Sequence, residues 1–308
     1  MRDTELFKAR AKETETEKEA LDAFFRGNLQ TALTRAENLI IDNDRAILST
    51  FYSKEFYSRI FEISPILNFT EKYYGPENMS IPIPDYEAEG EAPTFKSVIL
   101  KGHLMSSGPV PIGLDLVNNV NFNIVEHVFN LIAEDFRIAQ EKAILQGDEK
   151  IKGLSTLTNV VETAATDAIT SDELVTVNSK IYGKYLTRNC CWVMHPHTYT
   201  KIKLLKDGVG RYSFIQDNAG LCQGFSTTIL GYPVYVSENM PEPAPGKVAL
   251  YFGNFSEVMC KFSEAVELQI LKERYALQNA IGILGFEEFD AKLKDDNSQG
   301  IVALKFKA

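Results

Sequence analysis

The chain has 308 residues, of which 44% are hydrophobic and 24% are charged, and its formal net charge is −10. This apolar fraction is typical of a folded protein, and because no run of about 18 uncharged apolar residues occurs, the sequence predicts no transmembrane helix. The acidic start, Met1 to Glu5, lacks the basic and then apolar pattern of a signal peptide, so we expect a soluble, non-secreted protein. The net negative charge argues against a surface that binds nucleic acid through clustered Lys and Arg.

The N-terminal part of the chain divides into a charged segment and an apolar one. Residues 1 to 24 mix acidic and basic side chains with few apolar positions, which predicts a solvated helix or a mobile arm. Between residues 20 and 66, apolar side chains recur mostly at helical spacing. This second segment is therefore expected to dock on another surface.

The stretch from Ser80 to Phe95, SIPIPDYEAEGEAPTF, cannot be buried. Its prolines donate no backbone hydrogen bond, and its four carboxylates would each be costly to bury unpaired: Asp85, Glu87, Glu89 and Glu91. Because residues 78–83 and 94–105 are rich in extended-chain formers, we expect a long hairpin with an acidic tip. Two strands alone are marginal in water, and the chain offers no obvious surface to support them, so the hairpin is expected to need a partner surface.

The clearest predicted element is a helix over residues 121–147. Its apolar residues follow alternating spacings of four and three, which gives one continuous stripe: Val125, Phe129, Ile132, Phe136, Ala139 and Ala143. Asn121 or Asn123 can cap its start, and Gly147 can end it. At 1.5 Å per residue the helix would be roughly 36 Å long, which is enough for a structural spine.

After residue 147, predicted helices and strands are interleaved. A capping box at 170–173 predicts a helix, CCWVM at 190–194 a buried strand, and residues 197–205 another helix, followed by a glycine turn at 205–212. Four more strands are expected, at 227–237, 247–255, 257–262 and 265–271. Because the elements do not alternate as in a doubly wound sheet, the predicted fold class is α+β.

The best candidate for a metal site is the cluster CCWVMHPH. Cys190, Cys191, His195 and His197 are four potential zinc ligands, but adjacent side chains on a strand point to opposite faces, so both cysteines cannot reach one metal. We interpret them as buried thiols and turn histidines. The chain has too few cysteines for a disulfide framework, and all four are expected to be reduced and buried: Cys190, Cys191, Cys222 and Cys260.

Other polar residues suggest no catalytic site. His103 is interpreted as a surface histidine and His127 as a partly packed one. Glu287 and Glu288 follow an apolar run and are interpreted as the solvated end of a helix or strand.

Two glycine-containing segments also lack a catalytic or phosphate-binding pattern. Gly208 and Gly210, next to Lys206 and Arg211, lack the dinucleotide and Walker spacings and indicate a surface turn. The segment 224–228 lacks the second glycine of a nucleophile elbow. The sequence therefore predicts a protein that is not an enzyme, with no catalytic, cofactor or metal site.

Seven features, each weak alone, occur in an order that is specific. A docking arm, an acidic hairpin and a long helix are followed by four motifs: Gly147-Asp148 to Gly153-Leu154; Trp192 to Pro196, which leads through a helix to Lys206, Asp207, Gly210, Arg211 and Tyr212; Leu230 to Val234 with Ser237 to Pro241; and Ala249 to Phe255. In this order the chain, over roughly residues 20 to 308, resembles the major capsid protein family of tailed phages, the Hong Kong 97 type.

The resemblance implies a peripheral domain built on the spine helix and a long sheet, an axial domain near the capsomer symmetry axis, an N-terminal arm and an extended loop. On this basis we expect six segments: the arm (1–66), the extended loop (67–107), the peripheral domain with the spine helix (108–147), the axial domain (148–253), the second part of the peripheral domain (254–295) and a C-terminal strand of the axial domain (296–308).

The resemblance also implies a partner for the hairpin, namely the surface of a neighbouring copy of the chain. Contacts between subunits are then expected at these residues: Asp85, Glu87, Glu89, Glu91, Lys96, Lys101 and Arg211. Some family members link subunits covalently through a loop lysine and a neighbouring asparagine with the help of a glutamate. Lys96 or Lys101, with Asn279 and Glu287, are candidates for those parts, but their spacing is not a clean match and ordinary polar contacts are the other interpretation.

Many relatives carry a longer N-terminal scaffolding segment that a protease removes, whereas here only a short charged segment precedes the arm. Either scaffolding is a separate protein, or the numbering describes a processed or naturally short chain.

From the resemblance we expect a major capsid protein that assembles into the hexamers and pentamers of the icosahedral head of a tailed double-stranded DNA phage. Its expected partners are other copies of itself, portal and scaffolding or decoration proteins, and enclosed DNA held without sequence-specific binding, with no membrane. It would be located in the virion after assembly in the host bacterial cytoplasm. The alternatives are an encapsulin-type nanocompartment or a gene-transfer-particle shell and, from another class, a hydrolase or metal-dependent enzyme that uses the Cys/His cluster.

Overall fold

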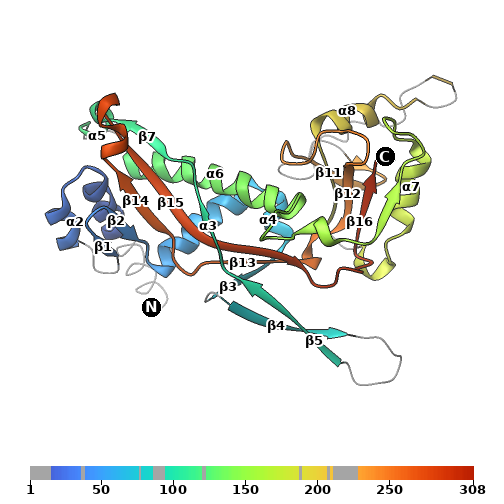
Figure 1. Cartoon of the computed structure of the whole chain (residues 1–308), viewed down its shortest axis with the longest axis horizontal. Coiled ribbons are helices and arrows are strands. Elements are labelled where there is room, and N and C mark those ends of the chain that lie inside the picture. The colour runs from blue at the N-terminus through green and yellow to red at the C-terminus, as the bar shows by residue number, and fades with distance from the viewer. Residues whose placement is uncertain are drawn as a thin grey trace, which may run out of the picture.

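The molecule is elongated and contains two sheets, one at each end of its long axis, with a hairpin that projects from the larger one (Figure 1). The computed structural model describes residues 15–35, 39–75, 78–85, 94–119, 123–186, 189–206, 209–210 and 228–308. No helix among these residues has the length and apolar character that crossing a bilayer requires.

The larger sheet has eight strands and is built around one long strand, β15 (Ala280–Leu293). The strand order is β1-β2-β14-β15-β13-β3, and β6 and β7 also pair with β15. The other strands of this sheet are β1 (Ile40–Asp42), β2 (Arg45–Ile47), β3 (Glu71–Tyr74), β6 (His103–Ser106), β7 (Val110–Gly113), β13 (Val258–Phe262) and β14 (Glu267–Leu271). The sheet thus joins strands from near both ends of the chain.

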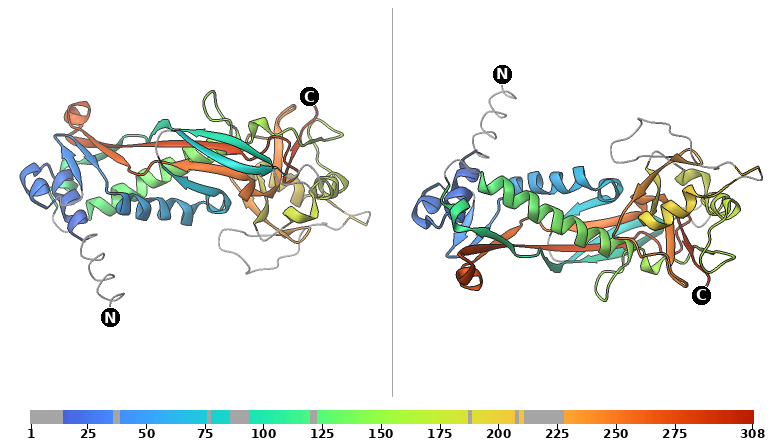
Figure 2. Two further views of the ribbon diagram at one scale, coloured as in Figure 1. Left: turned by 90° about the horizontal axis from the view of Figure 1, so that it is seen from below. Right: turned by 90° about the horizontal axis from the view of Figure 1, so that it is seen from above.

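Helices cover one face of this sheet, and the hairpin lies over the opposite face (Figure 2). The helices of this part are a helical segment at 15–25, α2 (Leu29–Arg35), α3 (Thr50–Ile63), α4 (Pro65–Phe69), α5 (Leu114–Val117) and α6 (Ile124–Leu145). Of these, α6 is the predicted spine helix. Its N-cap is Asn123, whose side chain accepts a hydrogen bond from the backbone N–H of Glu126, as the sequence allowed.

The core between helices and sheet is rich in aromatic residues. Phe56 of α3 packs edge-on against Phe129 and Phe136 of α6, with ring centroids 5.5 and 6.2 Å apart. Each such side chain contributes roughly 1.5–3 kcal/mol when it is fully buried. The apolar segment that the sequence expected to dock on a surface therefore docks on the chain's own α6.

The smaller sheet has six strands in the order β10-β11-β9-β12-β16-β8. Its strands are β8 (Val160–Glu162), β9 (Cys190–Met194), β10 (Thr228–Ile229), β11 (Tyr232–Val236), β12 (Val248–Asn254) and β16 (Ile301–Lys305), and α7 (Ser171–Ser179) and α8 (Pro196–Lys203) accompany them. Four short 3₁₀ helices complete the described elements: η1 (Leu154–Thr156), η2 (Gly183–Tyr185), η3 (Phe255–Glu257) and η4 (Glu273–Gln278). The chain leaves this sheet after β12, builds β13 to β15 of the larger sheet, and returns with β16.

Several of the motifs in the sequence have a clear local cause. Trp192 on β9 is fully buried, stacks on Phe252 at 4.0 Å between ring centroids, and donates its indole N–H to the carbonyl of Ile229. Thr170 and Glu173 form the predicted capping box of α7. Gly153 has a φ of 50°, and a Cβ there would overlap the carbonyl oxygens of Ala143 and Ile144, so glycine is required where the chain turns back on the end of α6.

The hairpin forms as predicted, but its second strand is shorter than expected. Strands β4 (Asn78–Asp85) and β5 (Thr94–Lys101) pair antiparallel over their whole length, whereas residues 103–106 belong to β6 and pair with β15. The expected single strand over 94–105 is therefore divided at Gly102. The tip, residues 86–93, lies outside the described residues.

The prediction for Glu287 and Glu288 is wrong. Both lie inside the 14-residue strand β15, and the side chain of Glu287 is buried beneath α6 rather than solvated. The prediction of a partly packed His127 is also wrong, because this residue of α6 is exposed, whereas His103 on β6 is half-buried. In each case the burial of the side chain depends on which face of the strand or helix it occupies, and the sequence did not predict that face.

Candidate assembly surfaces

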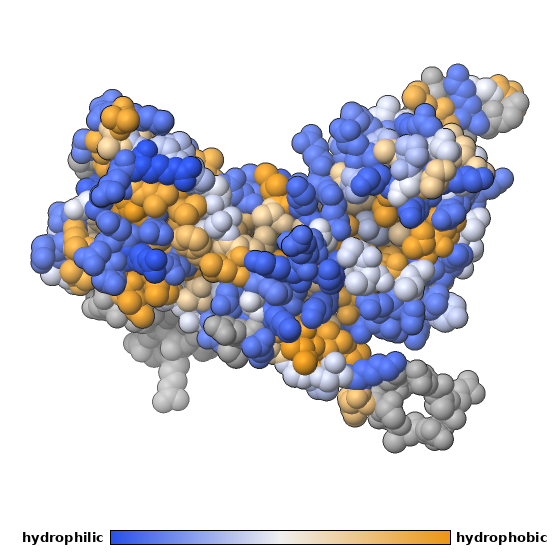
Figure 3. Space-filling view, in the orientation of Figure 1, coloured by the Kyte–Doolittle hydropathy of each residue, from blue (hydrophilic) through white to orange (hydrophobic). Residues whose placement is uncertain are grey.

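The projecting hairpin is the most prominent candidate for contact with another molecule. Apolar surface gathers over its described part (Figure 3), where Phe95 is 67% exposed and Ile99 is 50% exposed. Because a two-stranded hairpin is marginal in water by itself, this exposed apolar area favours a covering partner.

The structure places only some of the predicted contact residues. Lys96 and Lys101 lie exposed on β5, and Asp85 is the last residue of β4. The other four lie outside the described residues: Glu87, Glu89, Glu91 and Arg211. Their role in contacts between subunits stays a prediction.

The base of the hairpin packs on the chain's own sheet, and the expectation that the chain offers no surface for it is wrong there. Leu100 of β5 and Ile81 of β4 are buried against Met259 of β13 in a small apolar cluster. The backbone N–H of Lys101 donates to a carboxylate oxygen of Asp290 at 2.7 Å. The chain therefore supports the base of the hairpin, while the part that carries Phe95 projects.

A groove of about 500 Å³ lies between the hairpin and the body of the molecule. Pro82, Pro84 and Lys96 line its hairpin side, and Lys184 and Tyr185 of η2 line the side of the smaller sheet. The groove mixes proline and tyrosine rings with charged groups of both signs. It therefore offers a neighbouring chain both apolar and polar contacts.

A buried carboxylate joins the spine helix to the smaller sheet. Glu141 of α6 is completely buried and accepts hydrogen bonds from Tyr235 at 2.8 Å, Ser237 at 3.0 Å and Asn239 at 2.8 Å. Burial, and to a smaller extent the negative charge of Glu141, raise the pKa of Tyr235. Its hydroxyl therefore stays protonated and donates the hydrogen bond.

Two further donors reach Glu141 from the helical side. The hydroxyl of Ser64 donates to it at 2.5 Å, and Arg137 forms an ion pair with it at 3.1 Å. A buried carboxylate is stable only when its oxygens are fully paired, so these donors fix α6, α4 and the segment after β11 relative to one another.

The adjacent residue on α6 contacts a second buried carboxyl group. The side-chain amide of Gln140 donates to Glu287 of β15 at 2.5 Å. Burial raises the pKa of Glu287 to about 7. The hydrogen bonds from Gln140 and Tyr57 lower this pKa, but by less than burial raises it. Oε2 of Glu287 and Oε1 of Gln140 find no hydrogen-bond partner among the described residues, which favours a protonated Glu287 that can donate.

The residues proposed for covalent linkage do not meet within one chain. Asn279 is exposed immediately before β15, whereas Glu287 is buried eight positions further along the strand. At 3.3 Å per residue this separation is roughly 26 Å. Any linkage would have to combine different subunits and reach a buried carboxyl group, so it stays a prediction.

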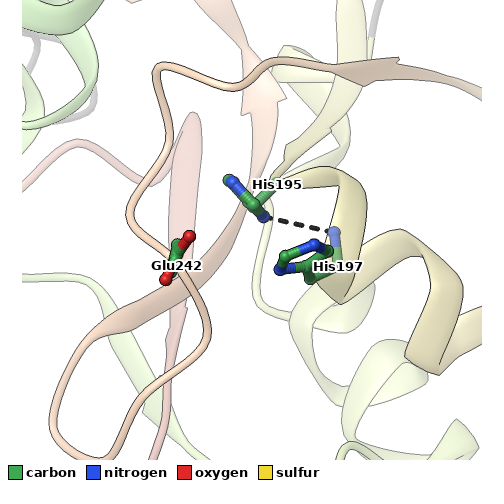
Figure 4. Close-up of side chains that lie close together, drawn as sticks. All are labelled: His195, His197 and Glu242. Carbon is green, nitrogen blue, oxygen red and sulfur yellow. Dashed lines mark hydrogen bonds between the residues drawn. The ribbon is translucent and has the colours of Figure 1, made fainter.

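The predicted histidine turn caps α8, as Figure 4 shows. His195 is the N-cap, and its Nδ1 accepts a hydrogen bond from the backbone N–H of His197 at 3.2 Å. Burial, followed by the effect of His197, lowers the pKa of His195, which favours the neutral form that can accept this bond.

Glu242 completes a cluster of three possible metal ligands with His195 and His197, within 4.8 Å of one another. Because Nδ1 of His195 is an acceptor, its Nε2 carries the ring proton, and a cation would also face the positive end of a helix dipole. The arrangement fits a helix cap better than a metal centre. Cys190 and Cys191 are not part of it, since both are buried free thiols on β9.

Burial keeps the described cysteines inert. It raises the pKa of Cys191, and it raises the pKa of Cys260 to about 12. Such thiols stay protonated at neutral pH and are poor nucleophiles and metal ligands. Cys222 lies outside the described residues.

The elongated shape and the projecting hairpin agree with a comparison of sequences. A sequence model of the phage capsid family matches residues 75–306. The chain belongs to the phage capsid family. It is thus a structural protein that forms a capsid shell, as the sequence predicted. No curated protein matches it significantly.

Solved capsid structures share the fold of this capsid protein. It is similar to the capsid of an empty GTA particle, determined with C5 symmetry, with a TM-score of 0.60 and 19% identity over 79% of this chain and 90% of that one. A structure from Microbacterium phage Oxtober96 gives 0.56 and 12% over 79% and 91%, and one from Mycobacterium phage Cain gives 0.55 and 12% over 80% and 90%. The likeness confirms the predicted α+β fold of the Hong Kong 97 type.

The sequence missed three of the buried polar residues that organise this capsid protein. Gln140 and Glu141 fall on the apolar side of α6, since Gln140 follows Phe136 by four residues. Glu287 lies on the same face of β15 as Ile283 and Phe289, which are also buried. Assigning each polar residue to a face of its helix or strand from the 3.6-residue or two-residue period would have predicted that these three are buried.

Proposed function

We propose that this capsid protein assembles into hexamers and pentamers of an icosahedral head that encloses double-stranded DNA. The observation that carries the proposal is the β4–β5 hairpin, which projects from the body with Phe95 and Ile99 exposed. A neighbouring copy of the chain would cover this surface, and the same hairpin would in turn cover the next copy. The arm, the extended loop and the edges of the proposed domains would then provide several separate contacts per subunit.

Several modest contacts suffice for a stable shell. Each additional contact of a subunit that is already bound is effectively intramolecular, so the affinities multiply. The groove beside the hairpin and the exposed Lys96 would supply polar contacts at the rim of this interface. Portal and scaffolding or decoration proteins would be further partners of this protein, which would assemble in the bacterial cytoplasm and be located in the virion.

The net charge of −10 supports a shell that holds DNA without binding it tightly. Free subunits are expected to show weak, sequence-independent DNA binding at physiological salt. Tight binding that falls steeply with added salt would contradict this part of the proposal.

A gene-transfer particle is the second candidate for the assembled product. It is favoured by the similarity to GTA capsids, with TM-scores of 0.60 for both the empty and the native particle. The sequence of the DNA inside purified particles separates the two, because a phage head holds one defined genome and a gene-transfer particle holds mixed fragments of the host genome.

The hairpin contact is tested with the variant Phe95→Ser with Ile99→Ser. We expect the variant subunit to fold, since both side chains are exposed, and to lose assembly into closed particles seen by negative-stain electron microscopy. The control is Ile138→Ser, which changes a side chain of α6 that is 40% exposed. Assembly of the double variant at the wild-type level would refute the proposed role of the hairpin.

A further inference from the structure

Four charged residues gather beneath the root of the hairpin. Glu288, Asp290 and Lys292 occupy alternate positions of β15 and therefore share one face of the sheet. Lys261 of β13 lies directly opposite Asp290 in the strand register and adds its side chain to the same face. This face is the one over which the hairpin lies (Figure 2).

The charges of this cluster are balanced and partly removed from water. The side chains of Lys261 and Asp290 are both completely buried, and the two outer residues are each 30% exposed. Lys261 pairs with Glu288 at 3.2 Å, and Lys292 pairs with Asp290 at 3.9 Å. Buried ions are tolerated only when they are paired, so a cluster that holds two of them is a specific arrangement rather than a solvated surface.

The cluster holds the backbone of the hairpin at consecutive points. Asp290 accepts the backbone N–H of Lys101 at 2.7 Å, and the ammonium group of Lys292 donates to the carbonyl of Ile99 at 2.6 Å. At Gly102 an added Cβ would lie 2.8 Å from Nζ of Lys261 and would overlap the carboxylate of Glu288. A side chain at position 102, directly after β5, would therefore displace the charged ends of this pair.

The residues held in this way are those at which the hairpin leaves the body. After Gly102 the chain continues into β6, which is fixed to β15 by its register. Before Ile99 the described chain is a two-stranded ribbon. The eight residues of β5 span about 26 Å, so a rotation of about 10° at the root would move its far end by roughly 5 Å.

We propose that Lys261, Glu288, Asp290 and Lys292 form an ionic clamp that fixes the angle of the hairpin, and that this angle selects which assembled product the subunits form. The partner of the positioned hairpin is a second copy of this chain, and this part rests on the proposed function. The four residues are positioning residues, since they act on the neighbour only through the hairpin.

The direct test is the double variant Asp290→Leu with Lys292→Met, which removes the acceptor of the Lys101 amide, leaves the Lys261–Glu288 pair in place and changes the net charge by zero. Hydrogen exchange of unassembled subunits is measured first. We expect the Lys101 amide to exchange roughly tenfold faster than in the wild type, as for the loss of one charge-assisted hydrogen bond. A second variant, Gly102→Ala, tests the same root by steric contact and keeps all four charges.

The matched control is Arg45→Met with Glu267→Gln, which removes an exposed ion pair between β2 and β14 of the same sheet. We expect this control to leave the exchange of the hairpin amides and the particles unchanged. The clamp variants are expected to form open sheets or particles of mixed size under conditions in which the wild type forms uniform shells, as seen by electron microscopy.

The outcomes separate the clamp from the proposed function. Unchanged exchange at residues 98–101 in both clamp variants would overturn the clamp. Faster exchange with shells identical to the wild type would overturn the claim that the angle selects the product. If the wild type itself forms no shell, the proposed function fails, and the exchange measurement still decides whether the clamp exists.

Discussion

The substitution Glu287→Gln tests the buried carboxyl group between α6 and β15. Glu287 is 2% exposed and receives the amide of Gln140 at 2.5 Å, while one oxygen on each side chain finds no partner among the described residues. Glutamine has nearly the same shape as a protonated glutamic acid and can also donate a hydrogen bond. The variant therefore removes the titration of this position while it preserves the packing.

The magnitude follows from the pKa. Burial raises the pKa of Glu287 from 4.5 to about 7, so the folded state takes up a proton that the unfolded state releases. The stability that this group contributes is fully present below pH 4.5, is lost progressively as the pH rises to 7, and changes no further above that value. The full loss corresponds to roughly 3 kcal/mol, at about 1.4 kcal/mol per pKa unit.

The assay is denaturant unfolding of unassembled subunits at a series of pH values between 4.5 and 8.5. We expect the free energy of unfolding of Glu287→Gln to rise relative to that of the wild type by roughly 3 kcal/mol across this range, with most of the change below pH 7. Glu264→Gln, at an exposed position, is the control and should follow the wild type. Curves for wild type and Glu287→Gln that stay parallel from pH 4.5 to 8.5 would refute the neutral, buried carboxyl group.

Three further predictions concern other buried or strained positions. Glu141→Ala leaves its donors unpaired and should cost about 3–5 kcal/mol in the free energy of unfolding, measured with urea; a loss under 1 kcal/mol would contradict the junction that Glu141 forms. Gly153→Ala should lower stability clearly more than Gly27→Ala, because both have positive φ but, among the described residues, Gly153 faces backbone within contact distance and Gly27 does not; equal losses in thermal unfolding would contradict this. His195→Ala should cost about 1 kcal/mol through loss of the α8 cap and His195→Asn should restore it, while Zn²⁺ should leave the melting temperature of the wild type unchanged; a rise that requires His195 would instead indicate a metal site.

The sequence predicted most of the fold because its strongest signals are local. The stripe on α6 and the caps at Asn123 and Thr170 depend only on residues within one or two turns of the helix. Trp192 and its neighbours form an uninterrupted apolar run, which is typical of a fully buried strand. Such elements are specified without knowledge of what they pack against.

The features that the sequence did not predict depend on contacts between distant residues. The length of β15 and the burial of Glu287 result from packing against α6, which is more than 130 residues earlier in the chain. The expected strand is divided at Gly102 because residues before it pair with β4 and residues after it pair with β15, and β15 lies far along the chain. The acidic tip and Arg211 lie outside the described residues, so their predicted contacts are still open to test.

The central claim is that the exposed hairpin is completed by a second copy of the chain, and electron microscopy of the purified protein tests it most directly. The protein is expressed alone and together with its neighbouring genes, and the particles are imaged by negative stain. We predict uniform closed shells in at least one of the two preparations. A compact monomer in both preparations, with no closed particles, would contradict the claim.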